Sequence, residues 1–196
     1  MNKKMIVLIL IIFIVLSNFL SCKKSSTNVL ADDKKSVRYV PIAVGNEWTL
    51  ASPNNPDWQE KFIIDSTKEY NTNIYYLLKL QFISGFSLTY AIRYGENDKI
   101  YIYKDGLEYV FWDFSKKDGE KYKSYKMGEG SEDYFEVTVS KNLTITTELG
   151  TIKNCIKFYF DAEKWADDEH SYIFGPEIGL VKYNELSLMS YKLNSE

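Results

Sequence analysis

The chain has 196 residues and carries 24 lysine and arginine residues against 27 aspartate and glutamate residues, a net charge of −3 at pH 7. An acidic chain without a basic stripe cannot neutralise many phosphates, so no nucleic-acid partner is expected. Two cysteines are too few for a disulfide framework or a thiolate metal site, and we expect no cofactor. Aromatic residues make up 16% of the chain, which favours β-strands.

The first residues have the layout of an export signal. Lys3 and Lys4 precede an apolar run over residues 5–16, and Ser21 precedes Cys22. A charged start, an apolar stretch and a small residue before the cut are typical of a segment that is removed after export. The run is shorter than the roughly 20 apolar residues that a spanning helix needs. Residues 1–21 are therefore predicted to be a signal peptide.

The cysteine at the predicted cut resembles the lipidation site of bacterial lipoproteins. The resemblance implies cleavage between Ser21 and Cys22, and attachment of acyl chains such as palmitate to Cys22. Phe19 stands where such signals usually have leucine, so an uncleaved single-span anchor is the main alternative. Two or three acyl chains, each worth about 0.8 kcal/mol per buried CH₂ group, would hold the protein on a membrane. Lys23 is not the aspartate that retains some lipoproteins in the inner membrane, which favours the outer membrane; the periplasmic or external face is left open.

Residues 22–38 are polar and lack an apolar period, so we expect a flexible tether. Loss of residues 1–21 removes Lys3 and Lys4 and no acid, which leaves 22 basic and 27 acidic residues and a net charge of −5. Residues 39–196 are long enough for a single domain with its own core.

Alternation of apolar with polar residues predicts that this domain consists of antiparallel strands. Same-face rows are Ile74, Tyr76, Leu78, Leu80 and Phe82; Phe86, Leu88, Tyr90, Ile92 and Tyr94; Leu143, Ile145, Thr147 and Leu149; and Ile152, Asn154, Ile156, Phe158 and Phe160. Turn residues separate the rows, and no helical spacing occurs outside the signal. The prediction is an all-β fold, an antiparallel meander of about ten strands that curls into a barrel or folds over as a sandwich.

Two stretches offer aromatic side chains for binding. Residues 107–114 are apolar on both faces of a strand, which predicts a strand sealed by a loop or by the barrel's own overlap, or an exposed patch around Trp112. Residues 121–126 interleave lysines with Tyr122 and Tyr125, an arrangement that can stack on sugars or that protects an edge strand. Trp112, Tyr122 and Tyr125 are the candidate binding surface.

A weak internal repeat runs through the domain. Residues 45–48 resemble residues 119–122, residues 69–82 resemble 148–160, and residues 94–103 resemble 174–183. The order is kept, and the offset stays between about 74 and 80 residues. Two similar β-halves that fold together would explain the repeat, although glycine turns between strands can also look alike by chance.

The two ends of the domain resemble uncharacterised bacterial envelope lipoproteins. Residues 39–48 match their Pro-x-x-x-Gly-Asn-x-Trp opening, and residues 174–183 are similar to their closing Pro-Gly-x-Gly-Leu-Val-Lys-Tyr stretch, with Glu177 in place of the glycine that follows the proline. The resemblance implies a β-rich envelope protein and brings no catalytic residue. Physically, Trp48 is expected to plug one end of the sheet, and Gly179 to allow a tight connection.

The sequence offers few residues suited to catalysis. His170 is the single histidine, and no Gly-x-Ser-x-Gly elbow is present. Residues 161–170 combine acids with His170, which could suit a metal ion, but the spacing matches no known signature and a solvated hairpin loop is the better interpretation. A pairing of Cys155 with His170 is a weaker idea than an ordinary strand cysteine. We expect neither a catalytic nor a metal site.

These observations favour a non-enzymatic, lipid-anchored β-domain of the cell envelope that binds a protein or glycan partner, of unknown identity, or supports envelope structure. One alternative is a carrier or sensor of an apolar small molecule inside a barrel. A second is an envelope hydrolase, which would need two inward carboxylates about 5–10 Å apart.

Overall fold

The computed structural model describes residues 39–126, 133–162 and 168–194. The chain divides into two units, Met1–Ala31 and Asp32–Glu196, and all described residues belong to the second. Their strands are β1 (Glu47–Ser52), β2 (Asn55–Tyr70), β3 (Asn73–Gln81), β4 (Ser87–Tyr94), β5 (Lys99–Lys104), β6 (Leu107–Asp113), β7 (Lys121–Lys126), β8 (Tyr134–Thr147), β9 (Gly150–Asp161), β10 (His170–Gly175), β11 (Gly179–Tyr183) and β12 (Leu186–Lys192).

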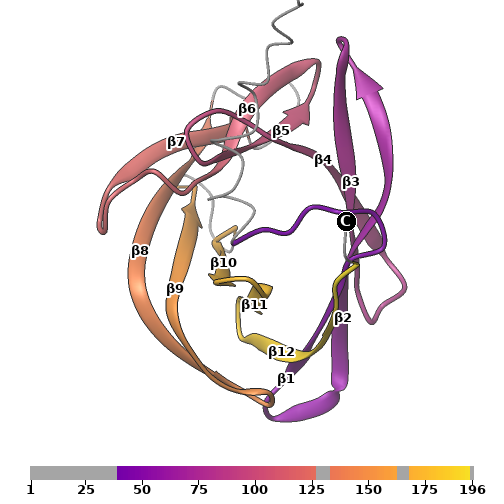
Figure 1. The fold of residues 1–196 in the computed structure, drawn as a ribbon, viewed down its shortest axis with the longest axis vertical. Helices are drawn as coiled ribbons and strands as arrows, with labels where there is room; N and C mark the ends of the chain where they lie inside the picture. The colour runs from indigo at the N-terminus through magenta and orange to yellow at the C-terminus, as the bar shows by residue number, and fades with distance from the viewer. Residues whose placement is uncertain (1–38, 127–132, 163–167, 195–196) are drawn as a thin grey trace, which may run out of the picture. The chain divides into compact units, whose positions relative to one another are not determined.

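The strands form one antiparallel meander that nearly closes into a barrel. The sheet order is β6-β5-β4-β3-β2-β1-β12-β11-β10-β9-β8-β7 (Figure 1). Because β1 pairs with β12, the first and last strands lie at the centre of this order. The all-β prediction is confirmed, with twelve strands rather than about ten.

Side chains, rather than a backbone ladder, close the barrel between β6 and β7. The Tyr122 hydroxyl group donates to the Phe111 carbonyl oxygen at 2.7 Å, and the Ser124 hydroxyl group donates to the Val110 carbonyl oxygen at 2.7 Å. Lys104 Nζ donates to the Lys126 carbonyl oxygen at 2.8 Å. We call this junction the β6–β7 seam.

A β-bulge explains the strand that is apolar on both faces. Ile100 pairs with Trp112 and Tyr101 with Val110, so Phe111 is an extra residue in β6. The bulge interrupts the strict alternation of side chains, and both Phe111 and Trp112 are buried, with ring centroids 4.1 Å apart. The barrel itself therefore seals this strand, one of the two outcomes expected.

The internal repeat in the sequence corresponds to a repeat in the structure. Strands β1–β6 and β7–β12 are two meanders of six strands each. At the start of the first, the Gly45 N–H donates to the Ile64 carbonyl oxygen at 2.7 Å; at the start of the second, the Gly119 N–H donates to the Val139 carbonyl oxygen at 2.8 Å. In each half the same partner returns a bond to the residue after the glycine, at 2.9 and 3.0 Å.

The opening and closing motifs contact each other. Trp48 is buried, and its indole N–H donates to the Ile178 carbonyl oxygen at 2.7 Å. Gly179 has φ +92°, and a Cβ there would lie 2.7 Å from the Trp48 ring. Asn46 is fully buried and joins the segment before β1 to the segment after β12. Its side chain donates to the Pro41 carbonyl oxygen and accepts from the Asn194 N–H, each at 2.7 Å. The Trp48 side chain therefore fills one end of the sheet, as expected.

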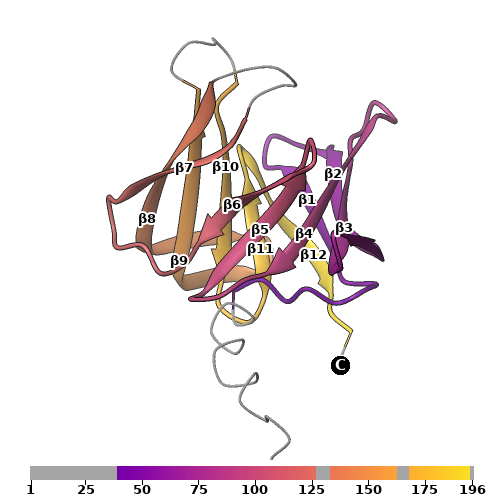
Figure 2. The same ribbon diagram turned by 90° about the horizontal axis from the view of Figure 1, so that it is seen from above.

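The barrel has two distinct ends. The N-terminal end holds residues 39–45, where Val40 and Ile42 are buried against the core. The hairpin turns at residues 53–54, 82–86, 105–106 and 184–185 lie at the opposite end, which we call the far end. Figure 2 shows the indigo segment before β1 along the lower side of the β unit and these turns toward its upper side.

Candidate functional site at the far end of the barrel

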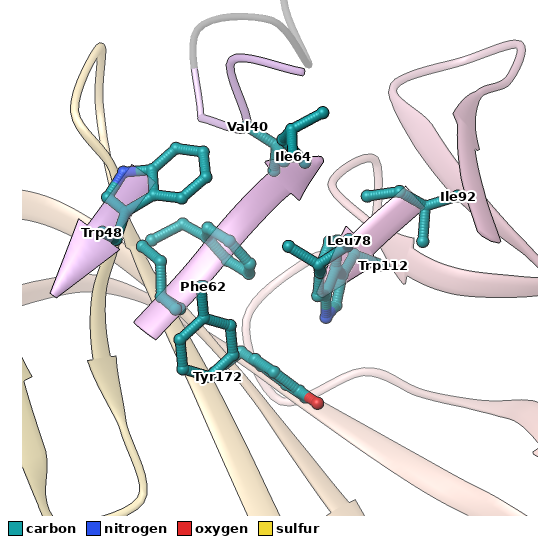
Figure 3. A pocket seen from close by; sticks show the side chains of 10 residues that line it. Val40, Trp48, Phe62, Ile64, Leu78, Ile92, Trp112 and Tyr172 are labelled. Carbon is teal, nitrogen blue, oxygen red and sulfur yellow. The ribbon is translucent and has the colours of Figure 1, made fainter. Parts of the chain in front are cut away.

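Side chains fill the interior of the barrel. The largest fully buried side chains include those of Trp112, Tyr172, Phe62 and Phe111. Between them remains a cavity of about 20 Å³, lined by Val40, Trp48, Phe62, Ile64, Leu78, Ile92, Trp112, Tyr172, Phe174 and Leu180 (Figure 3). This volume is close to that of one water molecule. The cavity therefore does not suit the carrier alternative, which requires room for an apolar small molecule.

Four tyrosines from four strands converge toward the far end of the interior: Tyr90 on β4, Tyr125 on β7, Tyr172 on β10 and Tyr183 on β11. The Tyr90 hydroxyl group interacts with those of Tyr125 and Tyr172, and the Tyr172 and Tyr183 ring centroids are 5.1 Å apart. Burial raises the pKa of all four phenols, so each keeps its proton at neutral pH. Even so, the Tyr172 oxygen makes no hydrogen bond of good geometry with any described residue.

His170 begins β10 beside this tyrosine cluster. Its ring stacks on Phe160 with centroids 4.7 Å apart, and its Nδ1 atom lies 3.1 Å from the Asp168 carbonyl oxygen. Since a carbonyl oxygen can only accept, we assign the proton to Nδ1, which leaves Nε2 to accept from the Tyr125 hydroxyl group at 3.5 Å. Burial lowers the pKa of His170, against a smaller opposing effect of Asp168, so the imidazole is neutral at pH 7.

Glu60 brings a carboxyl group to the same end. It lies on β2 opposite the buried Leu50 and two residues before Phe62, which places it in the inward-facing row. Its Oε2 atom is buried and has no hydrogen-bond partner among the described residues. Burial raises the pKa of Glu60, and an interaction with the Trp58 indole partly opposes this shift. The Glu60 carboxyl group also acts electrostatically on Tyr183.

Exposed apolar side chains also lie at this end of the barrel. Trp58 is 50% exposed and Phe86 is 59% exposed, and Ile83 and Leu107 are exposed to a similar degree. They lie on β2 near its start, on the β3–β4 turn and at the start of β6, all at the far end. We call these four residues the far-end rim. An apolar rim around a few polar groups is the usual composition of a binding site.

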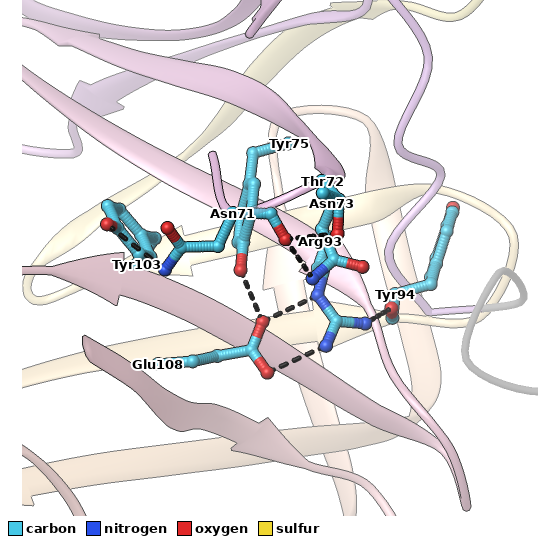
Figure 4. Close-up of polar contacts among 8 residues, drawn as sticks. All are labelled: Asn71, Thr72, Asn73, Tyr75, Arg93, Tyr94, Tyr103 and Glu108. Atoms are coloured by element: carbon cyan, nitrogen blue, oxygen red, sulfur yellow. Dashed lines mark hydrogen bonds and ion pairs between the residues drawn. The ribbon is translucent and has the colours of Figure 1, made fainter. Parts of the chain in front are cut away.

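A second polar cluster, on β3, β4 and β6, is structural (Figure 4). Arg93 holds Glu108 through two hydrogen bonds of 2.5 and 2.7 Å, and the Tyr75 hydroxyl group donates to the same carboxylate at 2.5 Å. The Arg93 guanidinium group also lies over the Tyr75 and Tyr101 rings. Each charge in this cluster has a partner within it, so the cluster stabilises the packing of β3 against β4–β6 and leaves no charge for a ligand.

The structure corrects the expectation of an aromatic surface at Trp112 and Tyr125. Trp112 is 1% exposed and Tyr125 is 5% exposed. The bulge at Phe111 turns Trp112 inward, and a register shift between Lys123 and Lys126 does the same for Tyr125. Tyr122 is half-buried, and its hydroxyl group is bound in the β6–β7 seam. None of the three offers an open surface.

Other expected sites are placed as follows. Ser21 and Cys22 lie outside the described residues, as does much of the acidic segment 161–170. No group of three or more potential metal ligands occurs among the residues that the structure describes. Cys155 is buried on β9. His170 pairs with Phe160, which is five residues after Cys155 on the same strand, so Cys155 and His170 do not form a nucleophile pair.

The sequence interpretation missed Trp58 and Glu60. Both stand in a row with Phe62 and Ile64, spaced two residues apart as on one face of a strand. A carboxyl group within a row that is otherwise aromatic and aliphatic is the signal that could have identified this position.

The described part of the chain contains no helix with the length and apolarity that a membrane span requires.

Comparisons with known proteins find two solved structures of low similarity. No family model and no curated protein matches the chain. A candidate exported protein with a YmcC-like fold from Bacteroides fragilis is similar with a TM-score of 0.43 and 14% identity, over 79% of this chain and 99% of that chain. A candidate lipoprotein from Parabacteroides distasonis is similar with a TM-score of 0.40 and 13% identity, over 78% of this chain and 97% of that chain.

Proposed function

We propose that this chain is a lipoprotein of the bacterial cell envelope, anchored in the outer membrane through acyl chains on Cys22, whose β unit binds a partner without catalysing a reaction. The observation that carries the binding function is the far-end rim, which exposes four large apolar side chains at the end of the barrel where Glu60 and the tyrosine cluster also lie. Residue 39, which follows the predicted tether, lies at the opposite end of the barrel. The rim is therefore free to meet a partner that does not share the tether's attachment point.

The contrast between a filled interior and an apolar rim supports this function over the alternatives. A carrier needs an internal cavity larger than the one of about 20 Å³. A hydrolase needs a second carboxylate near Glu60; among the described residues the buried acid is Asp113, which lies toward the N-terminal end and accepts hydrogen bonds from the hydroxyl group and N–H of Ser115. Binding at the outer surface of the far end needs neither feature.

Metabolic labelling with an alkyne-bearing fatty acid tests the anchor. We expect the full chain to incorporate the label and to sediment with the outer membrane, and Cys22→Ser to lose the label. Cys155→Ser serves as the matched control and should keep it, because Cys155 is buried in the β unit. Labelling that persists in Cys22→Ser would contradict the proposed anchor.

A further inference from the structure

The proposed function leaves open what the far end recognises, and Glu60 points to one chemical class. We infer that the far end binds an alkylammonium group, such as a lysine side chain of a partner, with Glu60 as its counter-charge. This inference rests on the proposed binding function and adds the chemistry of the ligand.

The first observation is a buried carboxyl oxygen that lacks a partner. Glu60 Oε2 has no hydrogen-bond donor, and no lysine or arginine among the described residues forms an ion pair with Glu60. The neighbouring Lys61 is instead paired with Glu47 at 2.8 Å. A buried charge without a counter-charge is costly, and an ammonium group supplies both the charge and the missing donors.

The second observation is the aromatic surroundings of this carboxyl group. The Trp58 indole interacts with it directly, and Tyr183 lies within its electrostatic influence. Tyr183 is held in place by Phe62, with ring centroids 5.1 Å apart. Aromatic faces attract cations and give no such advantage to anions, so the combination of carboxylate and rings selects a cation.

The third observation is access. Glu60 and Tyr183 are half-buried rather than enclosed, and Trp58 is half exposed. Because Oε2 itself is buried, an ammonium group meets it once the half-buried Glu60 side chain turns toward solvent, and its alkyl chain then lies along the exposed Trp58 ring. A neutral sugar could stack on Trp58 but would leave the charge of Glu60 unpaired, and an anion would be repelled by it.

The test uses the full chain in a non-ionic detergent, labelled with 5-fluorotryptophan. Each of the four tryptophans gives a ¹⁹F signal, and Trp58→Phe identifies the one of interest. Sodium chloride is replaced stepwise by butylammonium chloride at pH 8 and constant ionic strength, with butanol as the neutral comparison. We expect the Trp58 signal to shift and saturate with butylammonium and to move little with butanol.

Two variants sharpen the result. Glu60→Gln should weaken the butylammonium response at least tenfold, since the amide keeps the shape and removes the charge. Glu185→Gln removes an exposed carboxyl group from the same end of the barrel and should leave the response unchanged. Equal shifts of the Trp58 signal with butanol and with butylammonium in the unmodified chain would overturn the inference. An unchanged response to butylammonium in a folded Glu60→Gln protein would also overturn it. Either failure would leave the proposed binding function to be judged separately, by partner capture at the rim.

Discussion

At the scale of single residues, Gly179 shows how a backbone requirement and a packing requirement coincide. Its φ of +92° disfavours any side chain, and a Cβ would strike the Trp48 indole at 2.7 Å. Gly106 has a similar φ of +80° but faces open space. We predict that Gly179→Ala costs about 2 kcal/mol more unfolding free energy than Gly106→Ala, as measured by urea denaturation. Equal costs would mean that the contact between the two terminal motifs contributes little.

His170 predicts a pH dependence of stability. Burial lowers its pKa in the folded protein, so the unfolded chain takes up a proton at a higher pH than the folded chain does. The free energy of unfolding should therefore fall as the pH drops below about 6.5 towards the folded-state pKa, and should not depend on this group at higher pH. His170→Phe should remove that part of the slope between pH 7.5 and 5.5 in urea titrations. An identical slope in the two proteins would contradict the assignment of a buried neutral imidazole.

At the scale of strands, we expect the β6–β7 seam to be the weakest junction of the barrel, because hydroxyl groups replace the ladder of backbone hydrogen bonds. Tyr122→Phe leaves the Phe111 carbonyl oxygen without its donor, and Ser124→Ala does the same for Val110. Each loss should cost about 1–2 kcal/mol. Hydrogen exchange should accelerate in β6 and β7 and stay slow in β1 and β12, which are joined by backbone pairing. Uniform acceleration throughout the sheet would show that the seam is not a local junction.

The strands also show what can be read from a sequence and what cannot. Alternation over residues 74–94 predicts correctly that Leu78, Leu80 and Ile92 are buried, because the side-chain period of a strand is two. The same reasoning fails for Trp112 and Tyr125, since a bulge adds one residue and changes the side to which the following side chains point. Bulges depend on pairing with a neighbouring strand, and that neighbour is not visible in local alternation.

At the candidate site, the contacts that could not be predicted from the sequence are those that form because the sheet closes into a barrel. Glu60 can be read from the sequence as a carboxyl group in an apolar row, but its meeting with Tyr183 joins β2 to β11 through the curvature of the whole sheet. Tyr90 and Tyr125 meet for the same reason, although β4 and β7 are far apart in the sheet order. Contacts across a barrel interior follow from the number and tilt of all its strands, which no single segment encodes.

At the scale of the whole molecule, two six-stranded halves build one barrel with a plugged N-terminal end and an apolar far end. The internal repeat places equivalent turns at the same end of the barrel in both halves, yet within residues 39–126, 133–162 and 168–194 the four residues of the rim all come from the first half. The shared architecture thus supplies the scaffold, and side chains of the first half give the far end the apolar surface at which we propose that a partner binds.

The most direct test of this account is photo-crosslinking in living cells. A benzophenone amino acid is placed at Phe86, on the far-end rim, or at Val44, which is also exposed and lies in the segment before β1 at the N-terminal end. We expect a discrete crosslinked partner from position 86 and none from position 44. Crosslinks from position 44 alone, or the same products from both positions, would contradict the far end as the binding surface.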